Sequence, residues 1–224
     1  METLIDLQDA KVGYEEENPL FSALNFRMIR SEHVFVSGAC GVGKSALVKT
    51  ILGLLCLWGG SYYAFGRDMD APSAPLLSFV RKKIGVLPDR GILLQNMTVL
   101  QNISLPLRFG QFESMSRVMK LLEPFLEEFR LEEHFNKYPS DLNLDQVKKI
   151  GIVRALINDP DLLILDDPFE GLDDEGVSLL MNRLDRINRE REKTFLVLSR
   201  KSIDVPSYFR HRFCLTSDGL REVL

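Results

Sequence analysis

The chain has 224 residues, of which 45% are hydrophobic and 27% are charged, so a soluble globular domain with one substantial core is expected. Its net charge of -4 argues against a partner nucleic acid, because general nucleic-acid binders are usually basic. No apolar run approaches the ~20 residues of a membrane-spanning helix, and the acidic start argues against a secretory signal. The three cysteines lack disulfide or metal-ligand spacing, which favours a reducing cytosol.

The first thirty residues predict an antiparallel edge. Apolar and polar residues alternate over 4–30 and are interrupted at 15–19, which indicates two strands joined by a loop. Tyr14 falls at the end of the first strand. Its ring could stack on an adenine base, or it could be an ordinary half-exposed strand residue, and both interpretations stay open.

Residues 38–45 carry the strongest signal. They read Gly-Ala-Cys-Gly-Val-Gly-Lys-Ser and match the phosphate-binding pattern G-x-x-x-x-G-K-S/T at every specified position. Glycines let the backbone wrap closely around an anion, Lys44 can reach the terminal phosphates, and the Ser45 hydroxyl can ligate Mg²⁺. A buried strand at 33–36 and an apolar helix over 46–55 are expected on either side, and the helix adds its positive N-terminus. The motif predicts a site for ATP and Mg²⁺.

The middle of the chain changes from strands to helices. Residues 59–60 are expected to end the phosphate-loop helix, followed by a strand at 61–65 and an irregular, proline-containing connection. A second buried strand is predicted at 84–87. From 92 to about 156 apolar residues recur at helical spacing, with Pro124 perturbing one helix.

The last third returns to alternating strands and helices. A fully apolar strand is predicted at 162–165, a helix at 175–192, a buried strand at 195–198 and a terminal hairpin around 213–219. Strands that alternate with helices predict an α/β fold with a parallel sheet and a helical insertion.

We expect one domain over 1–224. Residues 1–90 and 157–224 would form its nucleotide-binding core with the antiparallel β part, and residues 91–156 its helical subdomain.

Two adjacent acids end the strand at 162–165. Asp166 can hold Mg²⁺ at the carboxyl edge of the sheet, and Asp167 can orient or deprotonate an attacking water. A turn or a helix cap is the alternative for such a pair. Because both acids directly follow four aliphatic residues in a chain that already has a phosphate loop, the catalytic interpretation is favoured.

In this order the motifs resemble the nucleotide-binding subunits of ABC transporters, over essentially the whole chain. The resemblance implies a P-loop NTPase fold with a RecA-like parallel core. The matching positions are the adenine-stacking aromatic at Tyr14, the Walker A loop at Gly38 to Ser45, the segment Ile84 to Asp89 leading to the Q-loop, the signature region Tyr138 to Gln146, its helix with Lys149, Ile152 and Arg154, Walker B at Leu162 to Pro168, the D-loop at Gly171 to Asp173, and the strand Thr194 to Arg200 leading to the switch histidine. The implied nucleotide contacts are Tyr14, Gly38, Ala39, Cys40, Gly41, Val42, Gly43, Lys44, Ser45, Ala46 and Asp166.

Four positions depart from the family pattern. The Q-loop glutamine is replaced by Asp89, the glutamate after Walker B by Asp167, and the switch histidine by Arg200. The signature Leu-Ser-Gly-Gly-Gln reads Leu-Asn-Leu-Asp-Gln over 142–146.

These departures predict slow hydrolysis or none. In the family, the signature of one subunit closes on the γ-phosphate held by the other. There Asp145 would repel each phosphate charge by about 4 kcal/mol at ~4 Å and an effective dielectric of ~20. The alternative is that Asp145 caps its own helix. Asp167 lacks one methylene relative to Glu, and a ~1 Å misplacement of a catalytic group can cost ~10²-fold in rate.

The substitutions could also compensate one another, because a lost glutamine and a lost histidine return as an opposite-charge pair. We expect Arg200 to reach the γ-phosphate or Asp167 in the role of the missing histidine, and Asp89 to supply a contact to Mg²⁺ or water. Catalytic roles are therefore assigned to Asp89, Asp167 and Arg200, and metal contacts to Ser45, Asp89 and Asp166.

The resemblance implies a cytoplasmic ATP-binding subunit held on the inner face of the membrane by a separate permease. The permease contact is expected over about Arg90 to Arg108, where the alternative is the interior of the helical subdomain. A second ATPase subunit, identical or different, is also implied. Short segments resemble the ATPases of Mla/Mce-type phospholipid transport systems, so a lipid cargo is expected, with lipoprotein-release and cell-division ATPases as competitors. A non-hydrolytic ATP-binding regulatory or structural subunit is the alternative of a different class.

Overall fold

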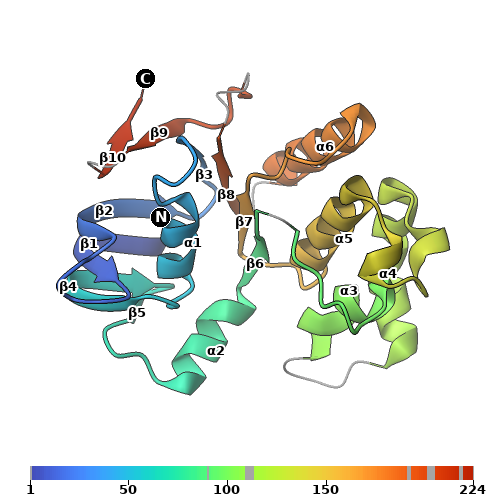
Figure 1. Cartoon of the computed structure of the whole chain (residues 1–224), viewed down its shortest axis with the longest axis horizontal. Coiled ribbons are helices and arrows are strands. Elements are labelled where there is room, and N and C mark those ends of the chain that lie inside the picture. The colour runs from blue at the N-terminus through green and yellow to red at the C-terminus, as the bar shows by residue number, and fades with distance from the viewer. Residues whose placement is uncertain are drawn as a thin grey trace.

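The computed structural model describes residues 2–89, 91–108, 114–190, 193–200, 205–216 and 219–223. Two sheets lie side by side, and a group of helices packs beyond the second sheet (Figure 1). This arrangement confirms the expected α/β class with an antiparallel part and a helical insertion.

The antiparallel sheet is built from the N-terminal part of the chain. Its order is β2-β1-β4-β5, and the strands are β1 (Thr3–Gly13), β2 (Phe21–Ile29), β4 (Cys56–Ala64) and β5 (Arg67–Asp68). Strand β1 pairs antiparallel with β2 on one side and with β4 on the other. The alternation at the start of the chain therefore predicted the first pair correctly.

Helix α1 (Lys44–Ile51) is shorter than predicted. The expected end at residues 59–60 is wrong, because residues 56–64 form β4 and not a helix. The apolar run alone fits either structure, and pairing with β1 decides for the strand. Gly53 follows the helix with φ +61°, a backbone conformation that suits glycine. At Gly60 a Cβ would lie 2.4 Å from the Asp9 carbonyl oxygen, so glycine allows β4 to approach β1.

The second sheet has six strands in the order β10-β9-β3-β8-β7-β6. Neighbours pair in parallel from β9 to β6, and β10 pairs antiparallel with β9, as the predicted hairpin requires. The strands are β3 (His33–Ser37), β6 (Ile84–Leu87), β7 (Leu162–Asp166), β8 (Thr194–Ser199), β9 (His211–Thr216) and β10 (Gly219–Glu222).

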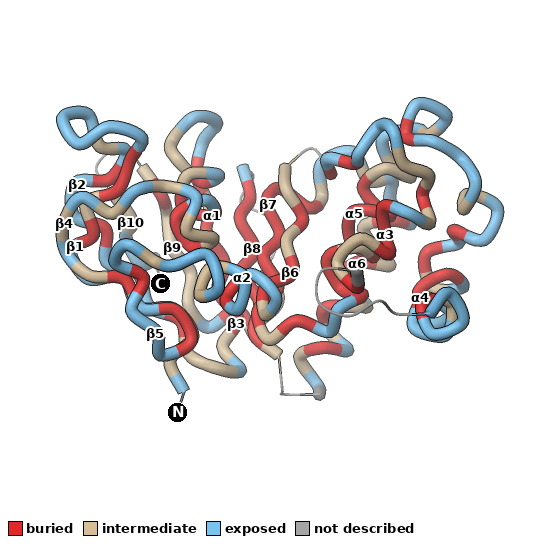
Figure 2. Tube along the Cα trace, turned by 90° about the horizontal axis from the view of Figure 1, so that it is seen from below, coloured by how far each residue is buried: buried red, intermediate tan, exposed pale blue. Residues whose placement is uncertain are grey.

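The central strands are buried on both faces, which explains their unbroken apolar runs. Phe35 and Phe195 belong to the core on the helical side of the sheet. Their neighbours Val34 and Leu196 belong to the core between this sheet and the antiparallel one. Strands β7 and β8 accordingly appear buried along most of their length in Figure 2.

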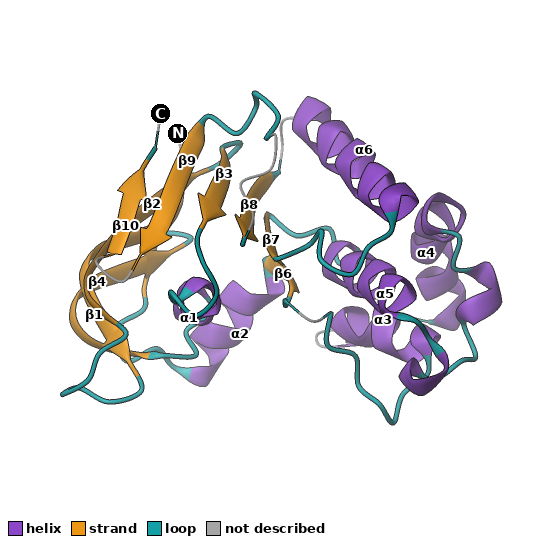
Figure 3. Ribbon diagram, turned by 45° about the horizontal axis from the view of Figure 1, so that its top comes forward, coloured by secondary structure: helices purple, strands orange, loops and turns teal. Residues whose placement is uncertain are grey.

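Four helices form the helical side of the molecule (Figure 3). They are α3 (Val99–Arg108), α4 (Met115–Phe129), α5 (Leu144–Leu156) and α6 (Asp174–Glu190), with short 3₁₀ turns at Glu132–His134 and Pro139–Asp141. Helix α4 contains Pro124, and the helix expected over 175–192 is described only to residue 190. Within the described ranges, no helix combines the length and the apolar character needed to cross a bilayer.

The connection before β6 is a helix, where an irregular segment was expected. Helix α2 (Ala74–Lys82) begins after Ser73, whose hydroxyl accepts a hydrogen bond from the Leu76 amide at 3.4 Å. Pro75 lies in the first turn, where its missing N–H costs no intrahelical bond. The proline that suggested a break therefore starts the helix.

Candidate nucleotide-binding site

The phosphate loop leaves the carboxyl end of β3 and runs into α1. Gly41 and Gly43 have φ values of +83° and +106°, so two left-handed residues turn the loop. A Cβ on Gly38 would lie 2.8 Å from the Leu215 carbonyl oxygen. Helix α1 has no side-chain cap and no acid in its first turn. Its N–H groups and positive dipole therefore face the loop, which is the arrangement that binds phosphate.

Lys44 is folded over its own loop. Its ammonium donates to the carbonyl oxygens of Gly38 and Ala39 at 2.8 and 3.0 Å, and it lies 4.0 Å from a carboxylate oxygen of Asp167. The side chain is only 6% exposed. The loop thus holds one buried positive charge among carbonyl groups and next to the acid that follows β7.

Ser45 and Asp166 form the part of the site that fits a metal ion. The Ser45 hydroxyl donates to one Asp166 carboxylate oxygen at 2.7 Å. The other oxygen is buried and has no hydrogen-bond partner among the described residues. Burial raises the pKa of Asp166, and the Ser45 bond opposes this shift. A hydroxyl and an orphaned carboxylate oxygen are hard oxygen ligands that suit Mg²⁺, so Ser45 and Asp166 would hold it.

The remaining predicted nucleotide contacts surround this centre. Tyr14, just beyond β1, is 62% exposed, and its hydroxyl accepts a hydrogen bond from Lys49 at 2.7 Å. Cys40 is exposed in the loop, and Val42 and Ala46 pack partly buried against the core. All of the predicted contacts thus belong to the loop, α1, the end of β1 or the end of β7.

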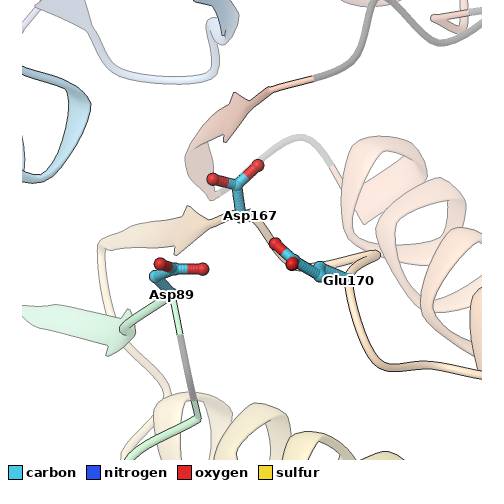
Figure 4. A group of neighbouring side chains, drawn as sticks. All are labelled: Asp89, Asp167 and Glu170. Carbon is cyan, nitrogen blue, oxygen red and sulfur yellow. The ribbon is translucent and has the colours of Figure 1, made fainter. Parts of the chain in front are cut away.

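Three acids from two segments of the chain meet beside the phosphate loop (Figure 4). Asp89 follows β6, Asp167 follows β7, and Glu170 lies in the turn before α6. One oxygen of each lies within 4.8 Å of the others. Asp167 adopts φ +45°, a left-handed conformation that aspartate tolerates better than most residues. Such a cluster repels itself unless a cation lies among its members.

Arg200 is that cation. Its Nε donates to Asp167 at 2.9 Å and its backbone N–H donates to the same carboxylate at 2.6 Å. One terminal nitrogen donates to both oxygens of Asp89 at 2.8 and 2.7 Å, and the other donates to Glu170 at 3.2 Å. The structure thus brings together Asp89, Asp167 and Arg200 from the sequence prediction. Asp89 was expected to contact Mg²⁺ or water. In the structure its carboxylate instead accepts hydrogen bonds from the Arg200 guanidinium.

Two members of this region escaped the sequence prediction. Glu170 could have been found, because it follows Asp167 by three residues in the same turn. Lys148 gave no such signal. Its ammonium donates to the backbone carbonyl of Asp89, and burial lowers its pKa although four nearby acids oppose the shift.

The signature segment begins α5. Asn143 is the N-cap: its side chain accepts from the Gln146 amide at 2.8 Å, and the Gln146 side chain accepts from the Asn143 amide at 3.0 Å. The alternative in which Asp145 caps the helix is therefore wrong. Asp145 instead pairs with Lys149 at 2.6 Å and accepts a hydrogen bond from the Asp173 amide at 3.2 Å. Its carboxylate thus ties the signature to the D-loop of the same chain.

A groove separates the sheet edge from the helical side. It has a volume of about 590 Å³ and lies between α2, β6, α3 and the end of α5. The loop beside it exposes the apolar side chains of Ile92 and Leu94 by 60% and 41%. The buried Asn102 amide bonds to backbone groups of Leu94, Met97 and Thr98 and so fixes this loop. Arg90, the first residue of the predicted permease contact, lies outside the described residues.

The chain matches the model of the family described as ABC transporter over residues 21–170. It is 28% identical, over 97% of its length, to a methionine import ATP-binding protein of Lacticaseibacillus paracasei, and covers 62% of that protein. It is 32% identical, over 73% of its length, to the protein of the same name from Ralstonia nicotianae, and covers 47% of it. The chain therefore spans less than two thirds of the length of these curated relatives.

Solved structures agree with this similarity. A dimeric ATP-binding cassette in a post-hydrolysis state with ADP and phosphate superposes with a TM-score of 0.88 at 26% identity, with 98% of each chain covered. A Clostridium perfringens protein that is part of an ABC transporter complex has the same fold, with a TM-score of 0.81 at 23% identity, over 100% of this chain and 88% of that one. The lipid specificity expected from short segments finds no support in these names.

Proposed function

Because the chain belongs to the ABC transporter family, we propose that it is the ATP-binding subunit of a transporter and works at the inner face of a membrane. The observation that carries this proposal is the bond between the Ser45 hydroxyl and the buried Asp166 at the end of a complete phosphate loop. This pair assembles oxygen ligands for Mg²⁺ where the loop amides would bind phosphate. The chain is an ABC-type ATPase by family and fold.

In this proposal ATP lies along the loop with its phosphates on the N-terminus of α1. Lys44 exchanges its bonds to the carbonyl groups of Gly38 and Ala39 for bonds to the terminal phosphates. Mg²⁺, when bound, neutralises phosphate charge. Asp167 orients the attacking water, and Arg200 places a positive charge beside it.

Turnover is proposed to be slow. The guanidinium of Arg200 already binds Asp167, and a carboxylate paired with a cation is a weaker base than a free one. The signature also offers Asp145 and Leu144 where its family pattern has two glycines. A non-hydrolytic ATP-binding subunit is therefore the second candidate, and this neutralised acid cluster is the observation that favours it.

The groove beside residues 91–108 is proposed to hold the permease. Two exposed apolar residues, Ile92 and Leu94, stand on a loop that Asn102 fixes, so the apolar surface is both accessible and ordered. Together with the neighbouring groove, these exposed apolar side chains favour a contact with another protein at this place. Strand β6 lines the groove and leads to Asp89, so a partner in this groove is proposed to act on the acid cluster through this strand.

The cargo is proposed to be chosen by the permease. We consider two classes of cargo. Short segments of the sequence resemble lipid transport ATPases, which suggests a lipid, whereas the similar proteins are methionine import ATP-binding proteins, which suggests methionine. The matches to the methionine proteins extend over most of the chain, so methionine carries more weight. A second ATPase subunit completes each site in this proposal, because the signature is presented to a neighbour.

The test is steady-state ATP hydrolysis by the complex isolated with its native membrane partner. We expect low turnover that requires Mg²⁺ and falls to background in Lys44→Ala, whereas Lys120→Ala on the exposed side of α4 has no effect. Methionine and phospholipid are each added to see which stimulates hydrolysis. Binding of ATP with turnover equal to Lys44→Ala would favour the non-hydrolytic subunit. Failure to bind ATP at all would refute both.

A further inference from the structure

Tyr14 combines an exposed ring with a fixed position. Tyr14 is 62% exposed, yet its hydroxyl and the carbonyl of the preceding Gly13 both have hydrogen-bond partners from other elements. We propose that Lys49 and Trp58 are positioning residues that hold the Tyr14 ring ready to stack on the base of the nucleotide. This inference rests on the proposed role of the chain in binding ATP.

Lys49 holds the ring by its edge. Its ammonium donates to the Tyr14 hydroxyl at 2.7 Å and lies 5.5 Å from the ring centre. The distance from Nζ to the ring centre exceeds the distance from Nζ to the hydroxyl oxygen by the length that separates centre and oxygen in a phenol. The ring centre, the oxygen and Nζ therefore lie almost on one line, which places Nζ nearly in the ring plane, beyond the hydroxyl. A cation over a ring face would block that face. This ammonium covers neither face of the ring.

Lys49 also links the ring to the phosphate loop. It lies in the last turn of α1, the helix that begins with Lys44. Five residues of an α-helix rise about 7.5 Å, so α1 fixes the separation between the anchor of the ring and the residues that would bind phosphate. A nucleotide spans just such a pair of contacts, one to its base and one to its phosphates.

The peptide group that joins Gly13 to Tyr14 is held by Trp58 and by close packing at Gly13. The Trp58 indole N–H donates to the Gly13 carbonyl at 3.3 Å, and that carbonyl belongs to the peptide unit that carries the Tyr14 amide. A Cβ on Gly13 would lie 2.9 Å from the Cα of Pro19 and 3.0 Å from the Leu20 nitrogen. Gly13 therefore lets the following loop pack against this peptide. The ring thus projects from a backbone that is fixed on two sides.

Such anchoring favours binding because it limits the freedom that the ring loses when a base stacks on it. Two other roles are possible for Lys49 at this place. Its charge could attract phosphate directly, or its bond to Tyr14 could be a surface contact with no effect on the ligand. The three cases differ in which part of ATP senses the lysine.

The test compares ATP with tripolyphosphate, which has the phosphates but no base, by calorimetric titration of the full chain. Lys49→Met is expected to weaken ATP binding about threefold to tenfold and to leave tripolyphosphate binding within about twofold. Lys49→Arg, which keeps a donor, is expected to restore most of the ATP affinity. Lys120→Met, the same change on the exposed side of α4, controls for loss of one charge. Trp58→Phe is expected to resemble Lys49→Met, with an unchanged thermal midpoint.

The chain contains a single tryptophan, which supplies an independent readout. Trp58 emission is expected to change when ATP binds, to stay unchanged with tripolyphosphate, and to lose its ATP response in Tyr14→Ala. In a Tyr14→Phe background, which lacks the hydroxyl, Lys49→Met is expected to have no further effect on ATP binding.

Three results would overturn the positioning role: equal weakening of both ligands by Lys49→Met, no weakening of either, or a full effect of Lys49→Met in Tyr14→Phe. A Tyr14→Ala chain with unchanged ATP affinity would refute base stacking itself. The proposed ATP site fails separately, if Lys44→Ala weakens neither ligand.

Discussion

Asp166 and Asp167 are neighbours in sequence with different surroundings. Asp166 ends β7 inside the sheet edge, with one oxygen bonded to Ser45 and the other left without a partner in the described chain. Asp167 turns into a left-handed conformation and is bound by the backbone and side chain of Arg200. One acid is thus left available for a metal ion, and the other is neutralised by a cation.

The buried charge of Asp166 is expected to lower the free energy of unfolding, and the pH dependence of stability should show this. Because burial raises its pKa, the folded chain holds this proton more tightly than the unfolded chain does, and stability falls as pH rises through that range. Asp166→Asn removes the charge and is expected to raise the free energy of unfolding by about 1–3 kcal/mol at neutral and higher pH. The gain should vanish at a pH low enough to protonate Asp166. Thermal unfolding across pH, without Mg²⁺, measures it.

The exposed Asp70→Asn serves as the control for this experiment, since it changes the same net charge away from the site. A gain for Asp166→Asn that persists unchanged at acid pH would show that ionisation is not its cause. Hydrolysis that needs Mg²⁺ should be lost in the stabilised variant, because the metal ligand is gone.

Arg200 should matter for hydrolysis through all three acids. Arg200→Ala makes Asp167 a stronger base, but it also removes the side-chain hydrogen bond that positions this carboxylate and leaves Asp89, Asp167 and Glu170 to repel one another. We expect the loss of positioning to dominate, so that ATP turnover by the isolated complex falls about tenfold to hundredfold. Arg200→Lys keeps the charge but replaces three nitrogens spread over a planar fork with a single one, so the present contacts to three carboxylates are not all kept and an intermediate rate is expected. Arg210→Ala, an exposed change at the opposite edge of the sheet, should have no effect. Unchanged turnover and ATP binding in Arg200→Ala would refute the role.

The N-terminus of α5 is packed against the D-loop as one unit. Asp145 pairs with Lys149 and also binds the Asp173 amide, while the Asp173 side chain accepts from the Gly176 amide at 2.6 Å. A Cβ on Gly176 would lie 2.7 Å from the Asp145 carboxylate, so a side chain there would break this contact. The Asp145 carboxylate, which was expected to repel a phosphate held by the neighbouring subunit, is therefore bound to groups of its own chain.

This network predicts a stability effect. Asp145→Ala leaves the ammonium of Lys149, a residue only 8% exposed, with Asp173 at 3.7 Å as its nearest acid. We expect a loss of about 2–4 kcal/mol in the free energy of unfolding, measured by urea denaturation. The pair Asp145→Ala with Lys149→Met should recover most of it, because no unpaired charge stays buried. A loss no larger than that of the exposed Glu123→Ala would show that the network does not stabilise the chain.

At the scale of the whole molecule, the parallel sheet assembles the site. The strands β3, β6, β7 and β8 run in the same direction, so their carboxyl ends meet at one edge. Asp89 and Arg200 are 111 residues apart and bond there. The acid cluster and the phosphate loop lie next to each other at this edge, where Lys44 is 4.0 Å from Asp167. The groove flanks the edge strand β6, which leads to Asp89.

Much of this arrangement could be predicted from local sequence. The loop at 38–45, the double-sided strands and the two acids after β7 each have a short signature with a physical cause. The resemblance to ABC subunits led to the expectation that Arg200 reaches the γ-phosphate or Asp167, and in the structure its side chain bonds to Asp167. Local patterns failed where two structures fit the same residues. Residues 56–58 could continue a helix, and Pro75 could break a segment or begin one.

The sequence by itself determined the class of fold, the phosphate loop and the residue types at the catalytic edge, because these depend on spacing within a few residues. Only the tertiary structure decided where α1 ends, because the pairing of β4 with β1 outweighs the helical preference of an apolar run. It also decided the partners of Asp145, Asp89 and Arg200. A charge selects its partner by distance and burial after folding, and neither quantity can be read from position along the chain.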